Sequence, residues 1–367
     1  MYEAFFELTG RPFPATPNVD AYYASSVHEE ALTLLRCGLA DGEALGLLVG
    51  PPGVGKTLLC HKLIQDLDPA SSLVFLGGLN DRGVESLLLA LLHDLSLPIP
   101  SGGAQRLRMS LSDFLMERFA GGGKTIVFVD EAQNLGPDQF EELRLLTNLE
   151  GPRRKAVQIL LVGQDPLMDS LDRDDLEAFR QRIAVYARLQ PLADEEVADY
   201  VRSQIARVGG SADSMFTASA LSEVCEYSSG LPRRINQIGH RALTLAYANG
   251  SGTIDAEFIH MAAAQLCLRK FQDGVEHHHA QLGAPSRRIV ADLAFSNPLP
   301  EPDGTAKAGG PAGPQPTVLE VGAEDAWDSQ SESFEASKES RNPAAKFDPV
   351  NRNAFAQRPR PGVERGA

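Results

Sequence analysis

The chain has 367 residues, 43% of them hydrophobic, and a net charge of -15 at pH 7. This length and apolar content are sufficient for two or three domains with a substantial buried core. The negative charge argues against a protein that coats nucleic acid non-specifically, because such binding depends mainly on Lys and Arg neutralising phosphates. A local basic patch remains compatible with this composition.

The cysteines and the N-terminus indicate the compartment. Four cysteines are scattered without CxxC spacing, which predicts neither a zinc site nor a disulfide framework: Cys37, Cys60, Cys225 and Cys267. We expect them to be buried small hydrophobic residues. The N-terminus lacks the features of a signal peptide, and no apolar run approaches about 18 residues. We therefore predict a soluble, cytoplasmic protein without a membrane span.

Short apolar runs alternate with amphipathic stretches between residues 44 and 191, a pattern typical of parallel strands joined by helices. Strands are predicted at 44–49, 72–76, 125–129, 157–162 and 184–189. Helices are predicted at 84–95, 107–119 and 139–149. The sequence therefore predicts an α/β fold whose core, residues 44–191, is a five-stranded parallel sheet.

The pattern changes to helices alone after residue 191. The apolar stripes predict helices at 194–208, 218–228, 232–248 and 256–268, which together form a helical lid domain at 192–270. From residue 281 onward Pro, Gly, Ser and Ala dominate and eleven of the 24 prolines occur. We predict a disordered tail at 281–367. Residues 1–43 remain as an N-terminal segment.

The segment at 50–57, GPPGVGKT, matches the phosphate-binding pattern G-x-x-x-x-G-K-[ST] between a predicted strand and a helical stretch. Its glycines let the backbone N–H groups face phosphates, and the following helix adds a positive dipole end. Lys56 is predicted to reach the β- and γ-phosphates of ATP, and Thr57 to ligate Mg²⁺. The expected nucleotide-binding residues are Gly50, Pro51, Pro52, Gly53, Val54, Gly55, Lys56, Thr57 and Leu58.

A buried-type strand ends in two carboxylates, Asp130 and Glu131. Ligands of α/β proteins bind at such strand ends. We expect Asp130 to bind the nucleotide's Mg²⁺ through its hydration shell and Glu131 to polarise the attacking water. The polar Gln133 and Asn134 that follow are not assigned a role.

Gln164 follows the strand predicted at 157–162. Its uncharged side chain is suited to hydrogen-bond the γ-phosphate or the water, so we predict it to be a catalytic sensor of hydrolysis. Two alternatives remain: Gln164 is a structural turn residue, or Asn148 is the sensor.

Three arginines are candidates to complete the site. Arg182, with Arg180 as the alternative, precedes the last strand, where it could reach a neighbouring subunit's nucleotide as an arginine finger. Arg233 lies in the first turn of a lid helix that begins with Pro232. A cation there opposes the helix dipole, so a phosphate is the expected partner and Arg233 the predicted lid sensor.

Five motifs, GPPGVGKT, VFVDEAQNL, ILLVGQ, FRQRI and GLPRRIN, together with the YEAFF opening, resemble the AAA-type ATPases of the general secretion pathway protein A family. The resemblance covers residues 1–270. It implies that residues 1–43 flank the adenine, with Pro17, Tyr22 and His28 as contacts. Related transposition helper ATPases share the DEAQ-type motif.

We therefore expect an ATP-hydrolysing motor or switch that forms a homo-oligomer, a ring or filament, and serves a secretion, pilus or polysaccharide-export machine. Family members typically continue through a transmembrane helix into a periplasmic domain, whereas here a polar tail follows, so a role at peptidoglycan is not expected. The first alternative is a DNA-targeting transposition helper, which the acidic composition disfavours. The second is a nucleotide-gated adaptor whose tail recruits partners.

Overall fold

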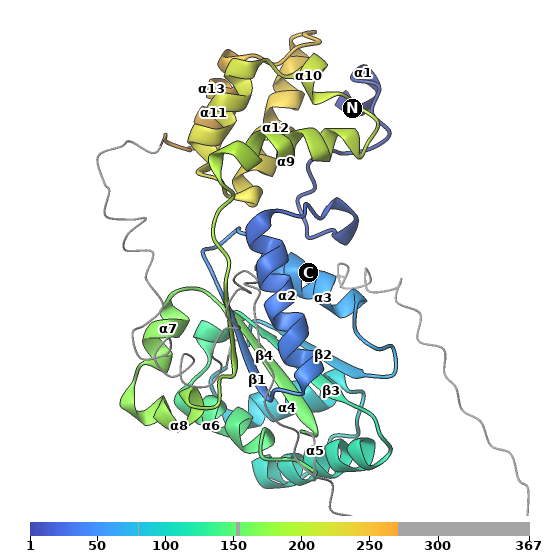
Figure 1. Cartoon of the computed structure of the whole chain (residues 1–367), viewed down its shortest axis with the longest axis vertical. Helices are drawn as coiled ribbons and strands as arrows, with labels where there is room; N and C mark the ends of the chain where they lie inside the picture. The colour runs from blue at the N-terminus through green and yellow to red at the C-terminus, as the bar shows by residue number, and fades with distance from the viewer. Residues whose placement is uncertain (80, 152–154, 271–367) are drawn as a thin grey trace, which may run out of the picture. The chain divides into compact units, whose positions relative to one another are not determined.

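The computed structural model describes residues 1–79, 81–151 and 155–270, and the predicted tail at 281–367 lies outside them. Five parallel strands form one sheet in the order β2-β3-β4-β1-β5 (Figure 1). The strands are β1 (Leu45–Val49), β2 (Ser72–Gly77), β3 (Thr125–Asp130), β4 (Val157–Gly163) and β5 (Val185–Arg188). This confirms the predicted sheet, with every strand end within one residue of its predicted position.

The central strands β3 and β4 are buried along their whole length. Alternate residues point to opposite faces of a strand, so the sheet contributes to two hydrophobic clusters. Leu47 and Leu161 belong to the cluster formed with α4 to α8. Leu48 and Leu160 belong to the cluster formed with α2 and α3. Helices on both faces account for the nearly continuous apolar runs of these strands.

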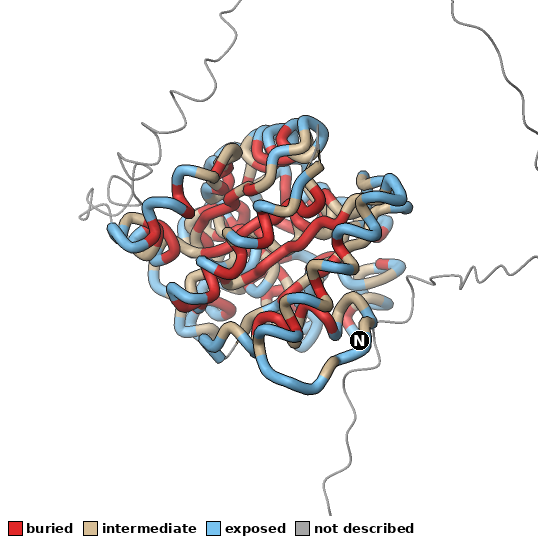
Figure 2. Tube along the Cα trace, turned by 90° about the horizontal axis from the view of Figure 1, so that it is seen from below, coloured by how far each residue is buried: buried red, intermediate tan, exposed pale blue. Residues whose placement is uncertain are grey.

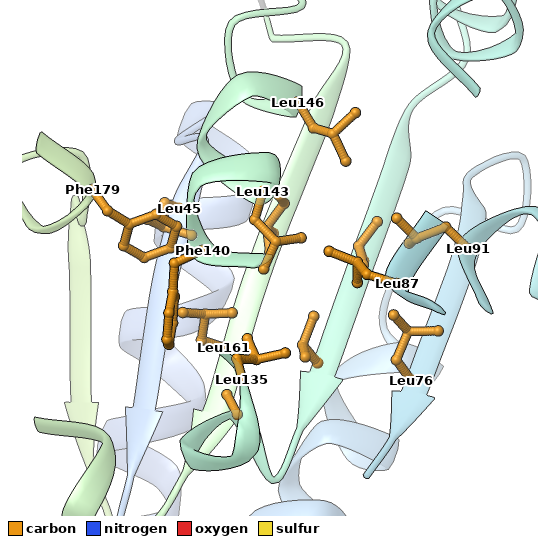
Figure 3. Close-up of a cluster of buried hydrophobic side chains, with 14 of the residues drawn as sticks. Leu45, Leu76, Leu87, Leu91, Leu135, Phe140, Leu143, Leu146, Leu161 and Phe179 are labelled. Carbon is orange, nitrogen blue, oxygen red and sulfur yellow. The ribbon is translucent and has the colours of Figure 1, made fainter. Parts of the chain in front are cut away.

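The core helices follow the strands in chain order. They are α3 (Lys56–Gln65), α4 (Val84–Asp94), α5 (Gly103–Ala120), α6 (Pro137–Leu146), α7 (Pro166–Leu171) and α8 (Glu177–Arg180), with short 3-10 turns η2 (Ala132–Asn134) and η3 (Asp174–Leu176). Figure 3 shows side chains of α4 and α6 directed at the strands, among them Leu87, Leu91, Phe140 and Leu143. Figure 2 shows that buried residues concentrate in the strands and on the inner sides of the helices.

The N-terminal segment divides between two hydrophobic clusters. It contains α1 (Tyr2–Phe5), η1 (Val19–Ala21) and α2 (Ser26–Asp41). Tyr2 and Phe13 are buried among lid helices, whereas α2 packs on the sheet through Leu32 and Leu35. Residues 1–43, which were expected to be one segment, thus contribute to two clusters.

The lid consists of helices alone. They are α9 (Asp194–Ala206), α10 (Ala212–Met215), α11 (Ala218–Ser228), α12 (Pro232–Ala248) and α13 (Ala256–Gln265). The bounds of α11 and α12 agree with the predicted helices, and α9 and α13 end two and three residues earlier than predicted. None of the helices in the described part of the chain is long and apolar enough to cross a membrane.

The expectation that all four cysteines are buried is wrong. Cys60 is buried under the sheet, but Cys37 and Cys267 are exposed and Cys225 is partly exposed. Cys37 lies on the outer face of α2, two residues after the inward Leu35. Position on the helix therefore decides burial here, and residue type alone does not.

Helix α2 approaches β5 most closely at Gly38. A Cβ at Gly38 would lie 2.2 Å from Cγ2 of Val185 and 3.3 Å from its Cβ. We expect Gly38→Ala to lower the free energy of unfolding, because overpacking costs about 1–3 kcal/mol and exceeds the gain in helix propensity. Urea denaturation measures the change.

The matched control is Gly252→Ala, since no heavy atom lies within 4 Å of a Cβ at Gly252. It should change the unfolding free energy by less than about 0.5 kcal/mol. An unchanged stability of Gly38→Ala would contradict the packing of α2 described above.

Candidate nucleotide-binding and catalytic site

The candidate site lies where the parallel strands end. The loop at 50–55 follows β1, Glu131 follows β3 and Gln164 follows β4. Because all strands are parallel, these segments meet at one edge of the sheet. The backbone N–H of Gly50 donates to the carbonyl of Gly163 at 3.3 Å, which ties the first and last of these segments together.

The loop is shaped by glycines that a side chain would disrupt. Gly53 and Gly55 have left-handed backbone angles, φ 82° and φ 110°, which favour glycine. Gly50 has no room for a Cβ, which would lie 2.5 Å from the carbonyl oxygen of Leu189. Helix α3 starts directly after Gly55, so its free N–H groups and positive dipole end face the loop.

The ammonium of Lys56 is bound by the loop that precedes it. Its Nζ donates to the carbonyl oxygens of Gly50 at 2.8 Å and Pro51 at 3.0 Å. Burial lowers the pKa of Lys56, and the carboxylates of Glu131, Asp130 and Asp165 act in the opposite direction. A phosphate oxygen can replace these carbonyls as a charged acceptor, which is a stronger partner for the ammonium.

Thr57 and Asp130 form a direct contact across the site. Thr57 Oγ1 donates to Asp130 Oδ2 at 2.7 Å, and Asp130 Oδ1 accepts from the backbone N–H of Glu131 at 2.9 Å. In the described ranges, no group of three or more His, Cys, Asp or Glu side chains is arranged to hold a metal ion. Two adjacent protein oxygens fit Mg²⁺, which usually takes few protein ligands and completes its shell with water and phosphate oxygens.

Glu131 adopts a left-handed backbone conformation, with φ 54° and ψ 39°. For a residue other than glycine this costs on the order of 1–3 kcal/mol and is found mainly at functional sites. Its Oε2 accepts hydrogen bonds from the side-chain amides of Gln133 and Gln164, the latter at 3.1 Å. The conformation therefore directs the carboxylate toward the end of β4.

Gln164 and its alternative Asn148 lie at opposite ends of the sheet. Gln164 follows the carboxyl end of β4 and contacts Glu131. Asn148 is exposed and comes after α6, whose last residue, Leu146, lies at the end of the sheet away from the arrowheads in Figure 3. The geometry favours Gln164 over Asn148 as the sensor.

His28 contacts the phosphate loop directly. Its Nε2 donates to the carbonyl of Val54 at 2.9 Å, and its Nδ1 accepts from Ser25 Oγ at 2.7 Å. Because a carbonyl only accepts, the proton must be on Nε2. Burial lowers the pKa of His28, while the hydrogen bond to Val54 and the carboxylates of Glu196 and Glu29 oppose this shift. Both ring nitrogens are thus bonded within the protein.

The other two expected adenine contacts differ in their surroundings. The hydroxyl of Tyr22 donates to Glu29 Oε1 at 2.9 Å, and its ring packs edge-on against the ring of His28. Pro17 is exposed. Tyr22 therefore contacts His28, which in turn is hydrogen-bonded to the loop.

The backbone of Arg233, the predicted lid sensor, lies against the phosphate loop. Its backbone N–H donates to the carbonyl of Gly53 at 3.1 Å. A Cβ at Gly53 would lie 2.9 Å from the Cβ of Arg233, so only glycine fits opposite the start of α12. The side chain of Arg233 is exposed.

Arg182 and Arg180 lie before β5, at the end of the sheet opposite the phosphate loop of the same chain. Arg182 is partly exposed, and its Nη1 donates to Thr147 Oγ1 at 3.0 Å. Arg180 is buried, and its Nη1 lies 3.9 Å from Asp172 Oδ1. Of the two, Arg182 is the one that a second molecule could contact.

Sequence reasoning assigned no role to two residues of the site, Gln133 and Arg188. Gln133 contacts Glu131, and Arg188 donates to Asp165 Oδ1 at 2.7 Å. His28 was predicted as an adenine contact, but its hydrogen bond to the carbonyl of Val54 was not. A signal for Arg188 exists in the sequence, because it is a charged residue within the apolar run at 184–189.

Comparison with known proteins supports the class that this fold and site define. Residues 40–171 match a family model described as AAA domain. The structure is similar to Cdc6p from Pyrobaculum aerophilum, with TM-score 0.56 and 19% identity over 67% of this chain and 68% of that one. It is also similar to the ORC2 protein of Aeropyrum pernix, with TM-score 0.53 and 15% identity over 69% and 72%. Residues 40–171 thus carry an AAA domain, and the likeness to these structures shows that the fold is shared with them.

Sequence similarity to a curated protein indicates a more specific relationship. The chain is 38% identical over 268 residues, 72% of its length, to general secretion pathway protein A of Aeromonas hydrophila. The match spans 48% of that protein, about half of its length. The chain is thus related to general secretion pathway protein A, as its motifs predicted.

The buried His28 predicts a pH dependence of stability. Its pKa in the native state is below the ordinary value of 6.5. Above pH 6.5, His28 is mostly neutral in both the native and the unfolded chain. As pH falls below it, the unfolded chain binds the proton before the native chain does, so stability is lost. We expect urea denaturation at pH 7.5 and 5.5 to show a smaller loss for His28→Gln than for the wild type.

His93→Gln is the control, because His93 is exposed, and it should lose as much stability as the wild type over this interval. Equal losses in all three proteins would show that His28 is not held neutral by its environment.

Proposed function

We propose that this chain binds ATP with Mg²⁺ and hydrolyses it, and that the nucleotide cycle drives assembly as a motor or switch. The observation that carries the proposal is the convergence of Lys56, Thr57, Asp130 and Glu131 at one sheet edge, with Thr57 and Asp130 in direct contact. A phosphate loop, two unequal carboxylates and a polar sensor are the parts that phosphoryl transfer to water requires.

The phosphate-binding roles follow from charge and geometry. Lys56 exchanges the loop carbonyls for β- and γ-phosphate oxygens. Thr57 would ligate Mg²⁺ through its hydroxyl and Asp130 through water, and the ion would supply charge neutralisation of the phosphates. The N–H groups at the start of α3 add donors that need no rearrangement.

Glu131 is the proposed general base. Its carboxylate lies next to Asp130 but differs from it in its partners, because Asp130 contacts Thr57 whereas Glu131 contacts Gln164. An aligned water would lose its proton to Glu131 as it attacks the γ-phosphate. Gln164 is bonded to the base and can also bond the phosphate or the water, which suits a sensor.

Arg182 is proposed to act on a neighbouring subunit's nucleotide. It precedes the amino end of β5, whereas Arg188 at the carboxyl end of β5 pairs in register with Val49, which precedes the phosphate loop. The length of the strand separates Arg182 from its own loop. A guanidinium that offsets transition-state charge would then come from a second copy, and a homo-oligomer, a ring or a filament, follows.

The lid and the N-terminal segment are proposed to respond to the nucleotide. The backbone of Arg233 lies beside Gly53, and its guanidinium is suited to contact a phosphate. Pro17, Tyr22 and His28 are the proposed adenine contacts, and His28 also holds the loop through its hydrogen bond to Val54. A change at the phosphates would thus alter contacts that α12 makes with the loop.

The similarity to general secretion pathway protein A supports a role in secretion or a related export process. We infer that the chain serves a secretion, pilus or polysaccharide-export machine on the cytoplasmic side of a membrane. The inference covers only the half of the relative that the chain matches. A DNA-targeting helper remains the competing outcome, and stimulation of ATP turnover by duplex DNA would favour it.

Removing the base should separate binding from turnover. Glu131→Gln keeps the size of the side chain but cannot accept the proton, so we expect ATP turnover to fall by about 100-fold or more while ATP still binds. Turnover assays with titration of a fluorescent ATP analogue measure both. Turnover within a few-fold of the wild type would refute the role of Glu131.

If Arg182 acts on the nucleotide of a neighbouring subunit, two inactive variants should complement each other. Arg182→Ala and Glu131→Gln should each be inactive alone, but their mixture should recover turnover, because some sites combine an intact Glu131 with an intact Arg182 from the neighbour. Arg173→Ala removes an exposed arginine paired with Asp175 and should change nothing. An inactive mixture, at concentrations where the wild type assembles, would place the function of Arg182 within its own subunit.

A further inference from the structure

Gln133 has no assigned role, although its side-chain amide contacts two parts of the site. The amide lies between the carboxylate of Glu131 and the backbone of Gln164. We propose that Gln133 is a positioning residue that fixes the orientation of the Glu131 carboxylate and determines which of its oxygens accepts the proton of the attacking water. The proposal rests on the proposed function, in which Glu131 is the base.

The two ends of the amide have different partners. Nε2 of Gln133 donates to Oε2 of Glu131, and Oε1 of Gln133 accepts from the backbone N–H of Gln164 at 3.1 Å. A carboxylate only accepts and a backbone N–H only donates, so the amide has a single orientation that satisfies both. A side chain without both a donor and an acceptor cannot make this connection.

The position of Gln133 is set by its surroundings. It lies in η2, the turn that begins directly after the strained backbone of Glu131. A Cβ at Gly163 would come within 3.0 Å of Gln133 Oε1, so the residue before Gln164 must be small for the amide to reach. Gln133 therefore bridges the carboxyl ends of β3 and β4.

Both amide donors reach the same carboxylate oxygen. Gln164 Nε2 also donates to Oε2 of Glu131, at 3.1 Å. Among the hydrogen bonds of the described residues, Oε1 of Glu131 has none. Oε2 is thus the anchored oxygen and Oε1 the one that can accept a proton. Because a base works only when aligned with the proton, loss of the anchor should lower the rate far more than the affinity for ATP.

The test uses the full-length protein and two substitutions. Gln133→Met keeps the length of the side chain and removes both hydrogen-bonding groups. We expect kcat to fall by about 10- to 100-fold, with KM and ATP affinity within about threefold of the wild type. Asn134→Met is the control. Asn134 is exposed in the same turn, and its variant should keep the wild-type kcat.

Gln133→Glu supplies a readout that packing alone would not give. When protonated, the new carboxylic acid can donate to Glu131 and accept from Gln164 as the amide does. When ionised it repels Glu131, with Asp130, Asp165 and Lys56 as the other charges nearby. The kcat of this variant should therefore rise toward that of the wild type as pH falls from about 8 to 6.5, whereas kcat of the wild type should not rise.

The outcomes separate the two proposals. A Gln133→Met variant with wild-type kcat would overturn the positioning role, as would equal losses in kcat and ATP affinity. If Gln133→Met does not fold, the pH profile of Gln133→Glu decides, and a profile parallel to the wild type overturns the role. Absence of turnover in the wild type, or full turnover in Glu131→Gln, would instead refute the proposed function itself.

Discussion

The parallel register of the sheet is the constraint on which the site depends. Val49 pairs with Gly163 and Gly77 pairs with Asp130, so four strand ends stop at a common edge. A shift of one residue in any pair would turn every side chain of that strand to the other face. It would also move Asp130 away from Thr57. The hydrophobic clusters on both faces of the sheet fix this register and thereby hold the polar residues in contact.

The site retains unfavourable features that the surrounding core must offset. Lys56 is nearly buried, which disfavours its charge, and Glu131 has a left-handed backbone. Hydrogen bonds stabilise both groups locally: Lys56 donates to loop carbonyls, and the Glu131 carboxylate accepts from side-chain amides. A nucleotide that replaces the carbonyls at Lys56 would find the remaining groups already in place, which lowers the cost of ordering the site.

Much of this arrangement was predictable because it is local in sequence. The strands end where apolar runs end, and residues 50–57 carry the whole phosphate loop, so both followed from patterns of a few residues. Glu131 was found in the same way. The recognition of the class rested on these motifs together.

Contacts between distant segments were not predictable in this way. His28 and Val54 are 26 residues apart, and Gln133 and Gln164 are 31 apart. Such pairs depend on strand order and on where a helix lies along the sheet, neither of which a local pattern contains. The predicted burial of Cys37 was wrong for a related reason. Residue type indicates an average preference, whereas the face of α2 on which the residue lies decides its exposure.

The division of the N-terminal segment affects how the chain can fold during synthesis. Phe13 packs against Gly239 with its ring 2.5 Å from the position of a Cβ, so the first residues to be made complete a cluster whose later members lie between Leu192 and Ala262. Helix α2, by contrast, can pack once the strands have formed. The start of the polypeptide must therefore remain unpacked until α12 has left the ribosome. The lid is a discontinuous unit, and a fragment that begins after residue 191 would lack part of its own interior.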